Sequence, residues 1–265
     1  MIRDALVAMS RVMFKWVDFN DNYGRDVIVE FAKSDDASKG KKAKKVILDL
    51  GAGEGDDLFN IQKSQPDAEL HAIESWEPNV KLLTSRGVTV HHADIEKMKL
   101  PFKDNSVDVI IINQVLEHTK DIFWILHEIM RVLKKDGRMI VGVPNLAAFH
   151  NRIILLSGVT PECMTLRGSH VRGFTFTDFN RLMKSYESVE LVGRRGTGFY
   201  PFPRFIAKPL ARLLPGLAWG LFVCYKKPGK YSGEFLKEGA RFAATSYYLG
   251  PDEEKYRKDI TATVH

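Results

Sequence analysis

The chain has 265 residues, of which 45% are hydrophobic and 27% charged, and 39 basic against 33 acidic residues give a formal net charge of +6. These proportions are typical of a globular domain and exclude a disordered chain, a collagen-like repeat and a disulfide scaffold. The two cysteines, Cys163 and Cys224, lie far apart and match no metal-binding spacing, so they predict reduced thiols in a cytoplasmic protein.

The chain shows no pattern of export or membrane insertion. Residues 1–16 carry Arg3, Asp4, Arg11 and Lys15 and lack the unbroken apolar core of a secretory signal. The longest apolar stretch, residues 213–225, is shorter than the about 20 residues of a spanning helix. We therefore expect a cytoplasmic protein that does not cross a membrane.

The first 45 residues predict an N-terminal extension. Residues 1–33 have the pattern of a loosely amphipathic helix, and residues 34–45 form a polar, Lys-rich linker. A lysine run of this kind is usually a solvated surface, and a nucleic-acid patch would have aromatic residues between the charges. Binding of nucleic acid is therefore not expected from this segment.

From Val46 onward, short apolar runs alternate with helical patterns. Strands are expected at residues 46–50, 69–74, 88–92, 107–113 and 138–143. Helices are expected at residues 56–64, from Pro78, and from Ile122 through Lys135, with Gly137 placed to end the last of them. This alternation predicts a parallel sheet with right-handed crossovers.

The pattern is less regular after Pro144. We expect a helix at residues 146–156, a helix capped by Thr177, a strand at 188–195 and a strand at 217–227. The domain would thus run over residues 46–227, with a variable substrate-facing region at about 144–175 and a helical insertion at about 199–216. Residues 228–265 form a C-terminal tail without a predicted structure.

The segment VILDLGAGEGDD, residues 46–57, carries the strongest chemical signal. A buried strand containing Asp49 runs into Gly51, Gly53 and Gly55, and glycines at such a turn allow a ligand to approach the backbone closely. A dinucleotide-binding loop would have its third glycine at position 56, where this chain has Asp. The loop therefore favours a ligand that carries positive charge in place of phosphates.

Polar residues also end the next three strands. Glu74 lies where a carboxylate accepts hydrogen bonds from ribose hydroxyls, Asp94 could accept from an adenine amine while Ile95 packs on the ring, and Asn113 follows the fourth strand. Strand-end acids also cap helices, and Asn113 could simply turn the chain. Their common register at one sheet edge is harder to explain by capping.

These segments, together with NQVLEH and RVLKKDGRMIVGVPN, resemble the class I S-adenosylmethionine-dependent methyltransferases over about residues 45–195. The resemblance implies an α/β, Rossmann-like seven-stranded sheet in the order 3-2-1-4-5-7-6, with the last strand antiparallel and helices on both faces. It implies S-adenosylmethionine as cofactor and S-adenosylhomocysteine as product. The cofactor-binding residues implied are Asp49, Gly51, Ala52, Gly53, Glu74, Ser75, Trp76, Asp94, Ile95 and Asn113.

The acceptor is predicted from weaker signals. Residues 143–158 and 168–183 resemble methyltransferases of bacterial glycan assembly, and the turn after the fourth strand lacks the Asn-Pro-Pro-Tyr-like sequence of base and amide methyltransferases. O-methylation of a saccharide, a glycan precursor or another small molecule is favoured. An RNA or protein methyltransferase and a non-catalytic cofactor-binding partner remain alternatives, and the oligomeric state is open.

His118 and His170 are the candidate catalytic bases, since a hydroxyl nucleophile benefits from a proton acceptor. Their alternatives are helix capping for His118 and loop packing for His170, and no metal is expected. In residues 199–224, basic residues recur every four positions beside apolar ones. This predicts either a basic amphipathic helix at the inner membrane face or a helix whose apolar face packs on the domain or on a second subunit.

Overall fold

The computed structural model describes residues 24–33, 44–184, 189–227 and 229–237. Most of the predicted N-terminal extension, most of the Lys-rich linker and nearly all of the C-terminal tail lie outside the described residues. The predictions made for those segments are not addressed by the structure.

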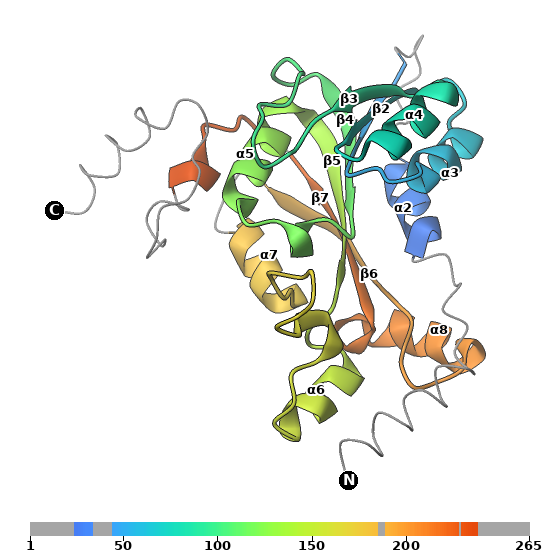
Figure 1. Ribbon diagram of the computed structural model, residues 1–265, viewed down its shortest axis with the longest axis vertical. Coiled ribbons are helices and arrows are strands. Elements are labelled where there is room, and N and C mark those ends of the chain that lie inside the picture. The colour runs from blue at the N-terminus through green and yellow to red at the C-terminus, as the bar shows by residue number, and fades with distance from the viewer. Residues whose placement is uncertain (1–23, 34–43, 185–188, 228, 238–265) are drawn as a thin grey trace, which may run out of the picture.

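One seven-stranded sheet organises the described chain, in the order β3-β2-β1-β4-β5-β7-β6 (Figure 1). The strands are β1 (Val46–Leu50), β2 (Glu69–Glu74), β3 (Thr89–His92), β4 (Val107–Asn113), β5 (Leu133–Pro144), β6 (Glu190–Thr197) and β7 (Gly220–Lys226). Strands β1 to β5 pair in parallel, and β7 is antiparallel to both β5 and β6. The predicted strand order and the antiparallel last strand are confirmed.

Helices cover both faces of the sheet because the central strands are apolar on both sides. Ile47 and Ile111 pack in a core with α2 (Arg25–Ala32), α3 (Asp56–Ser64) and α4 (Glu77–Ser85). Leu48 and Ile110, their neighbours in sequence, pack in a second core with α5 (Ile122–Val132) and α7 (Phe176–Lys184). Successive side chains of a strand point to opposite faces, so each strand contributes to both cores (Figure 1).

Three predicted helix boundaries are wrong, the first being the helix expected at residues 146–156, which begins at Phe149. Helix α5 ends at Val132, and Leu133 already pairs with Val107 as the start of β5, so Gly137 lies inside a strand. The Lys134 ammonium lies 2.7 Å from the Asp108 carboxylate and forms an ion pair between β5 and β4. Thr175, and not Thr177, caps α7, because its hydroxyl accepts a hydrogen bond from the Asp178 amide.

The ends of β5, β6 and β7 meet at one point of the sheet. Pro144 at the end of β5 and Thr197 at the end of β6 both pair with Gly220, which begins β7. The chain leaves the sheet there twice, into α6 (Phe149–Leu156) and into α8 (Arg204–Leu213), which lie at the same end of the molecule (Figure 1). Within the described ranges, no helix is both long and apolar enough to cross a membrane.

Candidate cofactor and acceptor site

The loop after β1 requires glycine at two positions for different reasons. Gly51 has φ +72°, and a Cβ there would lie 2.7 Å from Val115. Gly53 has φ +56°, and a Cβ there would meet no atom within 4 Å. The first glycine therefore allows close packing of the protein on itself, whereas the second faces open space in which a ligand could lie against the backbone.

Glu74, at the end of β2, is buried and closes this loop. One carboxylate oxygen accepts hydrogen bonds from the amides of Ser75 and Trp76 at 2.9 and 2.8 Å. The other accepts from the Gly53 amide at 2.8 Å. The carboxylate predicted for the ribose thus also fixes the distance between the glycine loop and β2.

Four charged residues and one amide surround the inner side of the loop. Burial raises the pKa of the Asp49 carboxyl well above its usual range, and the carboxylates of Asp57 and Glu74 raise it further, while Arg25 lowers it. Burial also raises the pKa of Asp57, against a hydrogen bond from Asn113 and the charge of Arg25. The Asn113 amide donates to Asp57 at 2.9 Å, and Arg25 lies 3.4 Å from the same carboxylate.

This acidic group fits a positively charged ligand. Buried carboxylates are unfavourable unless a cation or hydrogen-bond donors compensate them. One oxygen of Asp57 and the carbonyl oxygen of Asn113 are buried without a hydrogen-bond partner in the described chain. A bound sulfonium would add positive charge to that of Arg25, and a bound ammonium group would add both charge and hydrogen-bond donors.

The end of β3 supplies the predicted adenine side of the site. Asp94 accepts a hydrogen bond from the Glu96 amide at 3.0 Å and pairs with Lys97 at 2.9 Å. Lys97 is highly exposed, so this ion pair contributes little and leaves the carboxylate accessible. Ile95 packs against the core, and the Trp76 indole, 62% exposed, stands at the start of α4.

The predicted catalytic histidines are brought together from distant parts of the chain. His118 ends η2 (Leu116–His118), directly after β4, and His170 lies in the loop between η3 (Glu162–Met164) and α7. Their ring centroids are 4.7 Å apart in an edge-to-face arrangement. His118 contacts the Ser169 carbonyl through Nδ1 at 3.2 Å, so the two segments meet at this point.

The structure adds four residues that the sequence analysis did not place in the site. Glu117 is buried beside the two histidines, and burial raises its pKa to about 7. Gly142 leaves room for Asn113, because a Cβ there would lie 2.2 Å from the Asn113 carbonyl oxygen. Asp57 stands in the quoted glycine segment and could have been found, whereas nothing in the sequence connects Arg25 to it.

A family described as a methyltransferase domain matches residues 41–165. This segment is a class I methyltransferase domain. It contains β1 to β5, the glycine loop and the first of the two histidines. S-adenosylmethionine is the cofactor of such domains, as the sequence predicted, and the open space at Gly53 and the acidic group beneath it fit that cofactor.

The curated relatives match only part of the chain. The chain is 30% identical over 105 residues to a demethylmenaquinone methyltransferase of Thermus thermophilus, which covers 38% of this chain and 48% of the relative. It is 33% identical over 100 residues to the enzyme of that name from Lactococcus lactis, which covers 36% of this chain and 40% of the relative. The chain thus spans less than half the length of these two relatives.

Solved methyltransferase structures share the fold over more of the chain. The plantazolicin methyltransferase BpumL, solved with a pentazolic substrate analogue and S-adenosylhomocysteine, has a TM-score of 0.55 at 21% identity and covers 79% of this chain and 87% of its own. A Haloferax volcanii protein solved with the Trm112 methyltransferase activator has a TM-score of 0.54 at 13% identity and covers 86% and 97%. At these identities the likeness concerns the fold alone.

Proposed function

We propose that this protein transfers a methyl group from S-adenosylmethionine to a hydroxyl oxygen of a small molecule. The observation that carries the proposal is the position of the two histidines. His118 follows β4 at the sheet edge where the glycine loop, Asp57 and Asn113 would hold the methionine part of the cofactor, and His170, from the loop before α7, packs against it. The methyl donor and a pair of imidazoles would then face the same space.

The residues of the chain would bind the cofactor, orient the acceptor and help to remove the acceptor's proton. Glu74 would accept hydrogen bonds from the ribose hydroxyls, Asp94 and Ile95 would bind the adenine, and the acidic group at Asp49 would favour the positively charged end of the cofactor. Bound S-adenosylmethionine supplies an electrophilic methyl group. Orienting the acceptor oxygen in line with it can contribute about 7–11 kcal/mol.

His118 and His170 would assist removal of the acceptor's proton, which is worth roughly 10²–10⁴ in rate. They can do this directly as bases or through an ion that they hold, as argued below. An acceptor that is activated by neither route would leave turnover unchanged when both rings are removed.

A saccharide or glycan precursor is the proposed acceptor. The support is the resemblance of residues 143–158 and 168–183 to methyltransferases of bacterial glycan assembly, and the Asn-Gln-Val-Leu turn after β4. The RNA and protein alternatives are supported by the isoelectric point of about 9.1 and by the lysine-rich residues 39–45, of which only Lys44 and Lys45 are described. RNA and protein are therefore included as acceptors in the screen described below.

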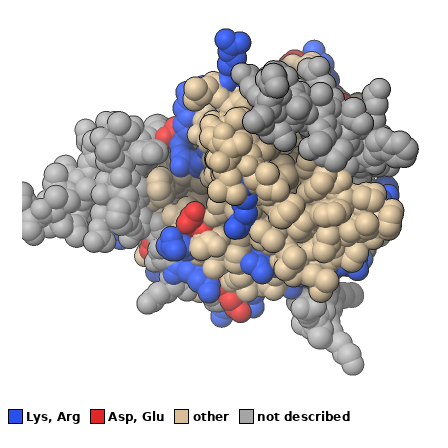
Figure 2. All heavy atoms as spheres, turned by 90° about the horizontal axis from the view of Figure 1, so that it is seen from below, with Lys and Arg blue, Asp and Glu red and all other residues tan. Residues whose placement is uncertain are grey.

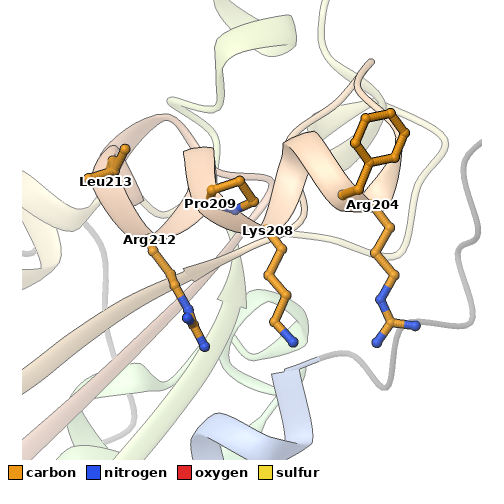
Figure 3. A pocket seen from close by; sticks show the side chains of 6 residues that line it. Arg204, Lys208, Pro209, Arg212 and Leu213 are labelled. Carbon is orange, nitrogen blue, oxygen red and sulfur yellow. The ribbon is translucent and has the colours of Figure 1, made fainter.

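Helix α8 presents a surface that suits an anionic membrane. Its buried side consists of the small residues Ala207 and Ala211, whereas Phe205 and Leu213 are 78% and 77% exposed. Arg204, Lys208 and Arg212 extend from one side of the helix and line a shallow groove with Phe205, Pro209 and Leu213 (Figure 3). Packing on the domain alone leaves Phe205 and Leu213 exposed, whereas Leu210 packs against Ala207 and Ala211, and packing on a second subunit stays the alternative to a membrane contact.

The same end of the molecule has further apolar exposure. Ile153, Leu155 and Leu156 of α6 are exposed, and so is Leu166 in the following loop. This face is mostly uncharged, with scattered Lys and Arg side chains and few acidic ones (Figure 2). We propose that it contacts the inner membrane face, which would bring a lipid-linked acceptor to the site.

A methyl-transfer screen tests the proposed reaction. Protein is incubated with S-adenosylmethionine labelled in the methyl group and with nucleotide sugars, lipid-linked glycans, demethylmenaquinone, RNA or protein. Label in an alkali-stable ether of a saccharide supports the proposal, and label in RNA or protein supports the alternative. Cofactor binding without transfer to any acceptor class would favour a non-catalytic partner.

Liposome co-sedimentation tests the membrane contact. Anionic vesicles should bind the wild-type protein at low salt, and the charge reversals Lys208→Glu and Arg212→Glu together should abolish binding. Lys81→Glu, at an exposed position of α4 on another part of the molecule, is the matched control and should bind as wild type. Failure of the wild-type protein to bind at low salt would contradict the membrane contact.

A further inference from the structure

Three potential metal ligands meet at the acceptor side of the site. One carboxylate oxygen of Glu117 and one ring nitrogen each of His118 and His170 all lie within 4.8 Å of one another. Donor atoms bound to a single ion are about 3–4 Å apart, given ligand distances near 2 Å. Small side-chain rotations would therefore bring the three groups onto one ion.

The Glu117 carboxylate lacks the partners that a buried acid normally has. Its side chain is 1% exposed, and neither oxygen has a hydrogen-bond partner in the described chain. A buried polar group without a partner is costly, and a buried carboxylate is compensated by a cation or by donors. A bound cation beside the two histidines would remove this cost.

Both histidines are held in the form that binds metals. Nδ1 of His118 contacts the Ser169 carbonyl at 3.2 Å, and Nδ1 of His170 contacts the Cys163 carbonyl at 2.9 Å. A carbonyl only accepts, so Nδ1 carries a proton in each ring, and Nε2 is the nitrogen that the neutral ring offers to a metal ion. Backbone carbonyls orient metal-binding histidines in this way.

The backbone joins the two segments that carry these ligands. The Glu117 carbonyl accepts hydrogen bonds from the amides of Val171 and Arg172 at 2.8 and 3.3 Å. Val115, two residues before Glu117, lies against Gly51 of the glycine loop. The cluster is therefore fixed in place and lies next to the methyl-donor site.

We propose that Glu117, His118 and His170 bind a divalent transition-metal ion. Two imidazoles and one carboxylate are the ligand set of catalytic zinc sites and of several iron sites, which leave further positions open for water or substrate. This donor set disfavours Mg²⁺ and Ca²⁺, which prefer oxygen ligands. No metal was expected from the sequence, and the ion proposed here would lie on the acceptor side, whereas cofactor binding needs no metal.

The role of the ion rests on the proposed methyl transfer. The acceptor hydroxyl would bind at an open metal position, which lowers its pKa, and its proton would leave to solvent water. The oxygen's electron pair then forms the bond to the methyl carbon, while the carbon–sulfur bond breaks and its electrons stay on sulfur. The sulfonium becomes the neutral thioether S-adenosylhomocysteine, so charge and atoms balance.

Metal binding is tested first, on full-length, tag-free protein without cofactor or acceptor. Titration calorimetry with Zn²⁺ should show one site, and Mg²⁺ should not compete for it. Glu117→Gln keeps the shape of the side chain, and Glu117→Gln, His118→Ala and His170→Ala should each lower Zn²⁺ affinity at least about tenfold. Glu69→Gln is the matched control, because Glu69 also contacts a histidine, His71 at 2.8 Å, outside the cluster.

Two outcomes overturn the site. One is unchanged Zn²⁺ affinity in the cluster variants, and the other is an equal loss of affinity in Glu69→Gln. Thermal unfolding of each variant shows whether it is folded. The His118 ring is exposed, so His118→Ala should fold and can test the site even if Glu117→Gln does not fold. None of these results depends on methyltransferase activity.

Chelation separates the role of the ion from the proposed function. Once an acceptor is found, removing the metal should abolish turnover and leave affinity for S-adenosylhomocysteine unchanged, and added Zn²⁺, Mn²⁺ or Co²⁺ should restore turnover. Full turnover in the chelated protein would overturn the role of the ion in catalysis. If the wild-type protein binds Zn²⁺ but does not bind S-adenosylhomocysteine, the metal site stands and the proposed function is contradicted.

Discussion

The carboxylate of Glu74 accepts a hydrogen bond from the backbone amide of Gly53 at 2.8 Å. This contact joins the end of β2 to the loop after β1, and it leaves one oxygen of the carboxylate bonded to two further amides. The same side chain is therefore both a proposed ribose acceptor and a tie that holds the loop. Its removal should affect cofactor binding more than the loss of one ligand contact would.

Glu74→Ala should weaken binding of S-adenosylmethionine by about 1–3 kcal/mol, because ribose hydroxyls and loop amides lose a charged acceptor. Titration calorimetry with S-adenosylhomocysteine measures the change. Glu77→Ala, three residues later at an exposed position of α4, is the control and should bind as wild type. Equal affinities in Glu74→Ala and wild type would show that the ribose is bound elsewhere.

Two glycine variants distinguish the effect of backbone strain on stability from the effect of a side chain on cofactor binding. Gly53→Ala and Gly87→Ala both place a side chain at positive φ with nothing within 4 Å, so each should cost about 1–2 kcal/mol of stability through backbone strain. Only Gly53→Ala should also lose affinity for S-adenosylhomocysteine. Chemical denaturation and calorimetry measure the two effects, and similar affinities for both variants would contradict the placement of the cofactor at Gly53.

Gly51→Val should abolish cofactor binding for a different reason. Its Cβ would lie 2.7 Å from Val115, at φ +72°, so the loop and the turn after β4 must move apart. We expect loss of S-adenosylhomocysteine binding together with a lower unfolding temperature. Retained affinity with normal stability would mean that the loop can rearrange without consequence for the site.

His127 should make the protein sensitive to acid. Burial lowers the pKa of its imidazole to about 4, below the value of 6.5 expected in the unfolded chain. Between these values the unfolded state binds more protons, so the free energy of unfolding should fall as pH drops from 6.5 to 4, by up to about 3 kcal/mol. Above pH 6.5 this contribution is complete.

Denaturation at pH 8, 6 and 5 measures this dependence. His127→Phe keeps a ring beside Trp124 and removes the titration, so its stability should depend less on pH over this range. It should also be less stable than wild type at pH 8, because the Nδ1 contact with the Tyr231 hydroxyl, 2.9 Å, is lost. Parallel curves for the two proteins would exclude His127 as the source.

Asn145 connects β5 to the acceptor side of the molecule. Its side-chain amide donates to the carbonyls of Gly216 and Ala218 at 3.0 and 2.8 Å, and its side-chain oxygen accepts from the Ala147 amide. Asn145→Ala should lower the free energy of unfolding by about 2–4 kcal/mol, because buried groups lose their partners. Affinity for S-adenosylhomocysteine should be retained.

Denaturant titration and calorimetry on the same preparation check both expectations. Asn60→Ala removes an amide on α3 that accepts from Lys63 at an exposed site, and it should change the stability by less than about 0.5 kcal/mol. A comparable loss in both variants would show that the buried position of Asn145 is not what matters.

Much of the cofactor half could be predicted from the sequence, because local patterns specify it. VILDL is apolar on both sides and could only be an inner strand, and the glycines after it fix the turn. The start of β5 was missed because Leu133 satisfies the helical spacing of α5 and also pairs with Val107. Residue 133 fits both a helix and a strand locally, and pairing with Val107 decides for the strand. Such pairing cannot be read from a single sequence.

The acceptor side was predicted less completely. His118 and His170 were expected individually, but their contact depends on where the loop before α7 folds back. Glu117 lies in the quoted segment NQVLEH but was not assigned a role, and only the three-dimensional structure shows that its carboxylate is buried. Arg25 reaches Asp57 from a segment outside the methyltransferase match, so no motif could have linked them.

The meeting of Pro144, Thr197 and Gly220 has a consequence for how new specificities could arise. Both excursions from the sheet, residues 145–189 and 198–219, begin or end beside this point, whereas the residues proposed to hold the cofactor precede it in the chain. Transplanting the two excursions from a relative would exchange much of the acceptor side, His170 included, and would leave Glu117, His118 and the residues proposed to bind the cofactor in place. Chimeras joined at Pro144, Glu190, Thr197 and Gly220 are therefore a direct way to change which acceptor is bound.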